Sequence, residues 1–201
     1  MAVAPTKGNL INLKKSLALA ENGYELLDRK RNILVREMMR LIDDAEQIQS
    51  AIDESYALAY QALQAANVSL GITAVKNAAS VEEENSLSLT YRSVMGAEIP
   101  RVDIKSKEPT VPRYGMHNTT PSLDEAFINF NKVKVLTARL AEIENSVYRL
   151  ANAVKKTRKR ANSLKNVVIP NFRSQIKIIT EVLEEKEREE FSRLKVIKSR
   201  K

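Results

Sequence analysis

The spacing of apolar residues divides the chain into two long amphipathic segments with a region of different character between them. If Leu10 is placed at position a of a heptad, the a and d positions up to Ala66 number 17, and 15 of them are apolar. Only about seven apolar residues would fall there by chance at a hydrophobic content of 43%. This repeat predicts a helix over residues 8–70 that pairs with another helix through one continuous stripe, which we call the seam.

The second amphipathic segment covers residues 122–198. Between positions 133 and 168, ten of its 11 a and d positions are apolar, which again predicts a helix with a seam. The residues at its start offer two signals. Either Pro121 occupies the first helical position, or Ser122 and Glu125 form a capping box.

The seam of the second segment changes register once. After Val168 the apolar positions slip by one residue and continue with Phe172, Ile176 and Ile179. Pro170 lies at the slip, and a proline inside a helix removes a hydrogen bond and clashes with the preceding turn. We therefore expect a bend near Pro170, with the helix continuing beyond it.

Residues 71–121, between the two segments, contain four of the six prolines and three of the five glycines, which predicts an insert rather than a helix. Within it, apolar and polar residues alternate over residues 87–91 and 102–104, so we expect a small β-hairpin at about 86–105. Pro100 restricts the second strand to a sheet edge, or to a start after the proline. Residues 106–121 are expected to form a loop.

These elements predict a mostly α fold. Two long helices joined by an insert of about 50 residues should fold back as a long antiparallel two-helix coiled coil, with the β-hairpin and loop at the turn end. Residues whose numbers sum to about 190 should then face one another. The C-terminal helix should project about two to three turns past the start of the first helix.

The composition excludes several kinds of active site. The chain has no cysteine and a single histidine, His117, so disulfides, thiolate zinc sites, cysteine nucleophiles, Ser-His-Asp triads and two-histidine metal sites are not expected. Neither Gly8 nor Gly115 begins a phosphate-binding loop. We expect no catalytic, cofactor-binding or metal-ligating residue.

The net charge of +8 is unevenly distributed, with both ends basic and the middle acidic. Five basic residues fill every position between the seam residues Val154, Thr157 and Ala161, and antiparallel pairing brings three more nearly opposite them. We call these eight the collar: Arg29, Lys30, Arg31, Lys155, Lys156, Arg158, Lys159 and Arg160. Three interpretations remain open: a solvated helix surface, a surface for a protein partner, or a nucleic-acid site, although the run lacks aromatic residues for stacking on bases.

No apolar run approaches the roughly 18 residues of a membrane span, and the N-terminus has no hydrophobic signal segment. We expect a cytoplasmic protein without direct membrane insertion.

Nearly the whole chain resembles one group of proteins, the D subunits of the V-type and A-type rotary ATPases. The resemblance lies in APTKGNLINLKKSL (4–17), NGYELLDRKRNIL (22–34), YRSVMGAEIPRV (91–102) and, most specifically, TRKRANSLKNVVIPNFRSQIKIITEVLEEKEREEFSRLKVIK (157–198). The sequence departs from the family at Lys7 and Gly8, where arginine and methionine are usual, and at Asp28, where a basic residue is usual.

This resemblance implies a non-catalytic central-stalk rotor protein, peripheral to the membrane and without a cofactor. A catalytic hexamer of A and B subunits would surround it, the F subunit would bind its side, and its lower end would seat on the subunit that caps the membrane ring. Its rotation would couple ATP hydrolysis or synthesis in the hexamer to ion translocation. The competing interpretation is a basic coiled-coil scaffold or nucleic-acid-binding protein.

The resemblance also suggests which residues contact partners. The collar is the first candidate for contact with the hexamer. The projecting end of the C-terminal helix around Phe191, Leu194 and Ile197 is the second. The hairpin around Met95 and Ile99 is a candidate for regulating ATPase activity or touching the F subunit.

Overall fold

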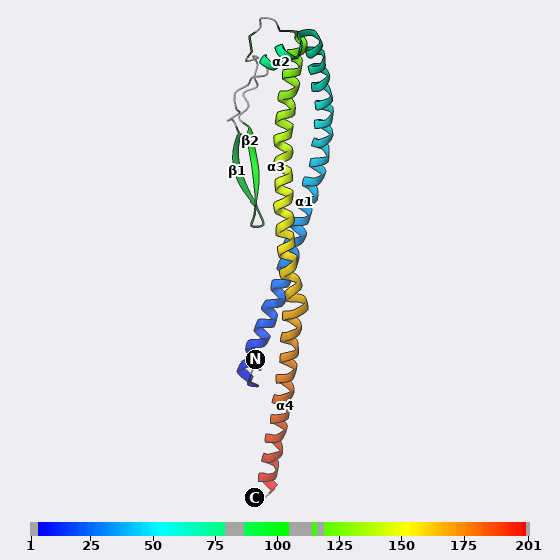
Figure 1. Cartoon of the computed structure of the whole chain (residues 1–201). Helices are drawn as coiled ribbons and strands as arrows, with labels where there is room; N and C mark the ends of the chain where they lie inside the picture. Colours follow the sequence, from blue (N-terminus) through cyan, green and yellow to red (C-terminus); the bar gives the residue numbers. More distant parts are fainter. Residues whose placement is uncertain (1–3, 79–86, 105–113, 116–118, 200–201) are drawn as a thin grey trace. The chain divides into compact units, whose positions relative to one another are not determined.

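The computed structural model describes residues 4–78, 87–104, 114–115 and 119–199. Apart from one hairpin these residues are almost entirely helical, which confirms the mostly α fold class (Figure 1). The elements are α1 (Lys7–Leu70), α2 (Ile72–Ala78), β1 (Leu87–Val94), β2 (Ala97–Ile104), α3 (Pro121–Ser163), the π-helical turn η1 (Leu164–Val168) and α4 (Ile169–Ser199). They form two compact units, Met1–Ile33 with Val154–Lys201 (the terminal unit) and Leu34–Ala153 (the hairpin unit).

The predicted seam of α1 is the buried face of that helix. All 17 of its a and d positions are buried or half-buried, including the polar exceptions Arg31 and Ser55. Leu34 and, on α3, Leu150 are fully enclosed. Towards the end of α1 the seam consists of small side chains, Ala59, Ala62 and Ala66, and all three are buried.

Contacts inside the terminal unit show that its helices run antiparallel. Glu21 of α1 pairs with Arg173 of α4, with 2.7 Å between the guanidinium nitrogen and the carboxylate oxygen. Lys7 pairs with Glu187 at 2.7 Å. The residue numbers of each pair sum to nearly the expected 190. Beyond Glu187, α4 continues for about three turns to Ser199, as predicted.

The hairpin unit follows the same pairing. The ring of Tyr60 on α1 meets the ring of Phe130 on α3 edge-on, with 5.6 Å between their centroids. Nearer the turn, the hydroxyls of Ser69 and Thr120 lie 3.4 Å apart.

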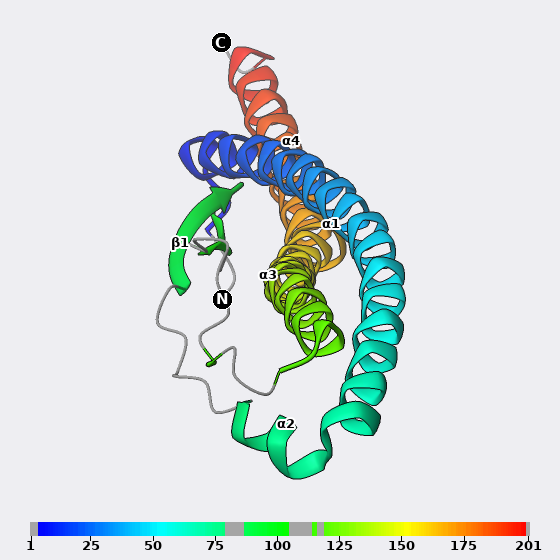
Figure 2. The same cartoon turned by 90° about the horizontal axis from the view of Figure 1, so that it is seen from above.

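A short helix that the sequence pattern did not predict follows α1 within the expected insert. Gly71, with φ of +81°, ends α1 because a residue without Cβ adopts this left-handed conformation at little cost. The chain then forms α2, which leaves the axis of α1 at a sharp angle (Figure 2). Val75 of α2 packs into a small apolar cluster with Ala66 and Leu123.

The start of α3 matches one of the two predicted signals. The helix begins at Pro121, and the N–H of Leu123 donates to the carbonyl oxygen of Thr120 at 2.9 Å. Proline at the first helical position sacrifices no hydrogen bond, because the N–H that it lacks would have no partner inside the helix.

The predicted hairpin is present, and Pro100 lies within its second strand. β1 and β2 pair antiparallel, with Tyr91 opposite Pro100. Because the sheet has two strands, Pro100 occupies an edge, which is one of the two positions predicted for it. The two turn residues, Met95 and Gly96, have φ of 50° and 75°, the left-handed conformations of a type I′ turn.

At the register slip the structure has a π-helical turn, Leu164–Val168, which ends two residues before Pro170. Ile169 is buried, whereas Val168 is only half-buried. The seam therefore passes from Leu164 to Ile169, five residues on, and continues with Phe172. The spacing from Leu164 to Ile169 contains one residue more than a regular heptad step. The slip therefore lies before Ile169, whereas the sequence pattern places it after Val168.

Candidate partner-binding surfaces

The five collar residues of α3 all point into solvent. Their positions lie between the seam residues Val154, Thr157 and Ala161, of which the last two are buried. Within the described part of the chain none of the five forms an ion pair; they are Lys155, Lys156, Arg158, Lys159 and Arg160. The structure therefore displays a dense group of cations without internal neutralisation.

The α1 part of the collar is less available. Arg29 pairs with Glu25 one turn earlier. Arg31 occupies a half-buried seam position, pairs with Asp28 at 2.7 Å and donates to the Asn32 side chain. Lys30 is half-buried. The strongest positive surface consequently lies on α3, with α1 contributing less than the sequence suggested.

The end of α4 carries exposed apolar residues on a helix stabilised by its own ion pairs. Lys177 with Glu181 and Arg188 with Glu184 are pairs at i, i+4, and Arg193 with Glu189 is a third. Such pairs favour an exposed helix. Phe191, Leu194 and Ile197 are 70%, 65% and 60% exposed, so all three are available to a partner.

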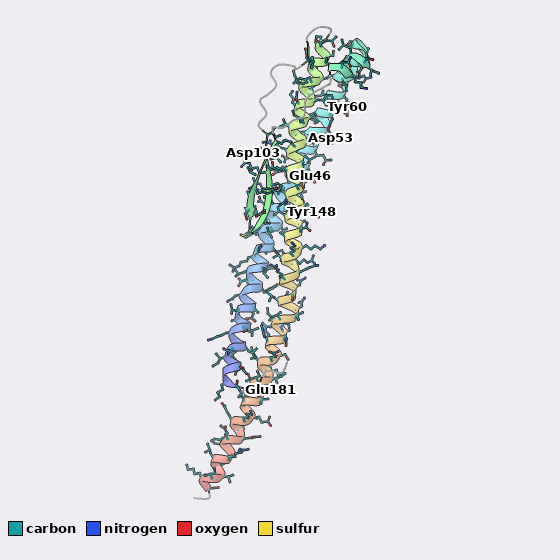
Figure 3. All side chains as sticks on the ribbon, turned by 60° about the vertical axis from the view of Figure 1, so that its left-hand side comes forward. Glu46, Asp53, Tyr60, Asp103, Tyr148 and Glu181 are labelled. Carbon is teal, nitrogen blue, oxygen red and sulfur yellow. The ribbon has the colours of Figure 1, made fainter. Side chains whose placement is uncertain are left out.

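The hairpin lies beside α3, where Figure 3 labels Asp103 on β2 and Tyr148 on the helix. In an antiparallel hairpin, bonded and non-bonded residue pairs alternate from the turn onward. Glu98, Pro100 and Val102 lie in the non-bonded pairs, so their backbone N–H and C=O groups point away from β1. Each of these three residues is met by a side chain of α3.

The contacts between β2 and α3 are regular. The N–H of Val102 donates to Glu142 at 3.0 Å, Ser146 donates to the carbonyl oxygen of Pro100 at 3.4 Å, and Arg149 donates to that of Glu98 at 3.4 Å. Positions 142, 146 and 149 share one face of a helix. Three outward backbone groups of β2 thereby have partners on α3, and Pro100 has no N–H that would need one.

Two further contacts fix the hairpin. Arg92 of β1 pairs with Glu37 of α1 at 2.7 Å. The guanidinium of Arg149 also lies over the Tyr91 ring, 5.4 Å from its centroid. These docking residues were not predicted from the sequence, because alternation within the hairpin indicates strands but does not indicate which helix face receives them.

The two hairpin residues proposed as partner contacts differ in the structure. Met95 at the turn is 47% exposed and accessible. Ile99 is 2% exposed, because it points inward beside the groove that Leu41 and Ile143 also line. In this conformation Ile99 contributes to the packing of the hairpin, whereas Met95 is available to a partner.

Near the turn end, Tyr114 donates to the carboxylate of Asp124 at 2.5 Å and packs edge-on against Phe127. Burial and the hydrogen bond to Asp124 raise the pKa of the tyrosine well above its usual value. Both contacts tie residue 114 to the first turns of α3. His117 lies outside the described residues.

Within residues 4–78, 87–104 and 119–199, no group of three or more His, Asp or Glu side chains is placed to hold a metal ion. No helix among the described residues is both long and apolar enough to cross a bilayer.

The paired helices, their heptad seam and the lateral hairpin place the chain in the class of antiparallel coiled-coil proteins. Comparison with known proteins specifies the family. The profile of the family described as the D subunit of ATP synthase matches residues 9–199. The chain belongs to this family.

Individual members of the family are similar to this chain over nearly its full length. The chain is 46% identical to a V-type ATP synthase D subunit of Thermotoga neapolitana, covering 100% of this chain and 98% of that protein. It is 36% identical to an A-type ATP synthase D subunit of Methanosphaera stadtmanae, covering 98% and 93%. It is 32% identical to the corresponding A-type protein of Thermococcus sibiricus, covering 99% and 94%.

Proposed function

We propose that this chain is the non-catalytic central-stalk rotor of a V/A-type rotary ATPase. In this role it turns inside a catalytic hexamer of A and B subunits and couples ATP hydrolysis or synthesis there to ion translocation through the membrane ring. The F subunit binds its side, and the subunit capping the membrane ring receives its lower end. The protein then works on the cytoplasmic side, peripheral to the membrane.

The observation that carries this proposal is the packing of the seam in a member of the D-type family of ATP synthase subunits. A shaft transmits torque only if its two helices cannot slide or separate. The seam positions of α1 are buried or half-buried throughout, and ion pairs such as Glu21 with Arg173 link the helices across the seam. The remaining exposed surface is available to the surrounding subunits.

Three surfaces are the proposed contacts with other subunits. The collar meets the hexamer, and the end of α4 around Phe191, Leu194 and Ile197 is held at the far end of the hexamer. Met95 at the hairpin turn contacts the F subunit or acts in regulation. A surrounded shaft that presents different side chains in different directions can hold three similar catalytic interfaces in different states.

The proposal is tested by co-expressing the full chain with the A, B and F subunits. We expect one complex that contains all four proteins, and ATP-driven ion uptake when the complete enzyme is reconstituted in vesicles. Reversing the charges of the five α3 collar residues, with the seam intact, should reduce coupled ATP hydrolysis. A chain that never joins the complex, or an enzyme that transports ions equally well without it, would contradict the rotor function.

A further inference from the structure

The helical segment that carries the collar is free of acidic residues over a long distance. From Val154 to Thr180 the sequence has eight lysines and arginines and no aspartate or glutamate. Glu181, labelled in Figure 3, is the first acidic residue of α4. This segment cannot neutralise its own charge.

The opposing helix does not neutralise it either. Before Leu34, α1 has only three acidic residues, and each already has a partner. Glu21 pairs with Arg173, while Glu25 and Asp28 pair with arginines of their own helix. Among the described residues, the five α3 cations of the collar therefore face solvent without a carboxylate.

These cations surround the exposed part of the helix instead of forming one stripe. Successive residues of an α-helix turn by about 100°. Lys155 and Lys159 therefore share one side, and Lys156 and Arg160 lie about 100° further round. Arg158 lies on the opposite side of the helix from Lys156 and Arg160. Only the seam itself is free of positive charge.

Such an arrangement is unfavourable for the isolated protein. Lys155 with Lys159, and Lys156 with Arg160, are like charges at i, i+4, which destabilise a helix. Densely spaced cations also raise the local positive potential, which attracts an anionic partner. Because no carboxylate among the described residues pairs with these cations, an anionic partner would relieve their repulsion.

We propose that the α3 collar is a docking surface for an acidic protein surface that surrounds the helix pair. This inference rests on the proposed function, and it adds the chemistry of the enclosing surface: carboxylates directed at the collar from several sides. A partner on one side would leave the cations on the other side unused. An enclosing partner uses all of them at every orientation of the shaft.

The same geometry disfavours a nucleic acid. A duplex approaches a helix from one side, so it would reach either Arg158 or the pair Lys156 and Arg160, but not both. Single strands bind through exposed aromatic rings on which bases stack. The run at residues 155–160 contains no aromatic residue. In the terminal unit the ring of Tyr24 is half-buried and lies beneath Lys165 at 5.8 Å, although Tyr148, earlier on α3, is exposed.

The test compares neutral substitutions on opposite sides of the helix. One variant is Arg158→Gln, and the other is Lys156→Gln with Arg160→Gln. A matched control, Lys132→Gln with Arg139→Gln, removes two exposed cations of the same helix outside the collar. The full-length proteins are titrated against the assembled hexamer of A and B subunits, and in parallel against duplex DNA, at increasing KCl concentrations.

We expect both collar variants to bind the hexamer more weakly, by roughly 2- to 5-fold per cation removed, and with a flatter salt dependence. The control should bind as the unchanged protein does. The thermal midpoint of the collar variants should stay the same or rise, because like-charge repulsion is removed. Weaker binding then cannot be attributed to unfolding.

Other outcomes overturn the inference in distinguishable ways. If the unchanged chain binds the hexamer but neither collar variant weakens it, the collar is merely solvated, and the rotor function stands. If only one variant weakens binding, the partner does not surround the helix pair. Tighter binding to DNA than to the hexamer at the same salt identifies a nucleic-acid site. A chain that does not bind the hexamer at all rejects the rotor function together with the inference.

Discussion

The backbone N–H of Ile169 donates to the carbonyl oxygen of Leu164, and this bond joins two consecutive residues of the seam. In a regular helix the seam residue after Leu164 would be Val168, four positions on. The π-helical turn accommodates one additional residue, so Ile169 takes the buried position and the residues after it face α1 again. The register slip in the sequence and the π-helical turn are one feature.

Deleting Asn166 together with Pro170→Ala should therefore produce an uninterrupted α-helix with a regular heptad from Ala161 to Leu183. Because the deletion removes the extra residue, the free energy of unfolding should change by less than about 1 kcal/mol. Deleting Asn152, which lies in regular heptad spacing, is the control. It turns the downstream seam residues out of the interface and should cost more than about 3 kcal/mol. Urea unfolding followed by circular dichroism measures both, and equal losses would show that the turn does not absorb the slip.

Met95 adopts a positive φ that costs a residue with a Cβ about 1–2 kcal/mol, and asparagine tolerates it better. Met95→Asn creates the Asn-Gly pair favoured in type I′ turns, so the hairpin should become more stable by about 0.5–1 kcal/mol. Hydrogen exchange of the Ile99 amide, which lies in a bonded pair with Arg92, measures this. Met95→Val, the control, should accelerate exchange. Faster exchange in the asparagine variant would contradict this account of the turn.

Glu142 holds the β2 edge through the Val102 amide. Glu142→Ala removes a charge-assisted hydrogen bond, so docking of the hairpin should weaken by about 1–2 kcal/mol. The expected signs are faster hydrogen exchange at Val102 and greater cleavage of the hairpin by proteases. Glu144→Ala removes an exposed carboxylate of the same helix and should have neither effect. Unchanged exchange at Val102 in the Glu142 variant would show that the edge contact is dispensable.

The pairing of Lys7 with Glu187 should make the first turn of α1 sensitive to pH. The hydrogen bond from Lys7, and then its charge, lower the pKa of Glu187 below 4.5, and the same contact raises the pKa of Lys7 above 10.5. The carboxylate contributes stability above its unfolded pKa and loses it as the pH falls through the folded value. The ammonium contributes below its unfolded pKa and loses it as the pH rises through the folded value.

Protection of the first amides of α1 against hydrogen exchange, corrected for intrinsic rates, should therefore be constant between about pH 5 and 10 and fall outside that range. Glu187→Gln should remove the decrease at low pH, while Glu185→Gln should preserve it. A decrease of the same size in both variants would assign the effect to other groups.

The sequence predicted the elements that repeat over a long stretch of chain. Seventeen consecutive heptad positions average out single exceptions such as Arg31, so the seam of α1 and the antiparallel pairing followed from pattern alone. Features that depend on a single residue are harder to predict from the sequence. Gly71 alone predicts only a break, because glycine ends a helix in many contexts, so the sequence pattern does not predict α2.

Burial of the hairpin residues could not be predicted either. Alternation places Ile99 in a strand but does not tell which face of the strand meets the helices. The structure shows that this face is the inner one, since Arg92 beside it reaches Glu37 of α1. The collar is predictable because its charge density is visible in the sequence. The lack of neutralising carboxylates became visible only once the ion pairs of Glu21, Glu25 and Asp28 were located.

The contact between Lys7 and Glu187 has a consequence for the order of events during translation. The N-terminal part of α1 leaves the ribosome first, but the residues that cover its seam, on α4, are made last. At about 5–20 residues per second, synthesis of the chain lasts about 10–40 s. Throughout that time the apolar stripe around Leu13 and Leu17 has no native partner, and isolated helices are only marginally stable in water. The apolar stripe of the nascent N-terminal helix therefore stays uncovered by its native partner until the last turns of α4 have emerged.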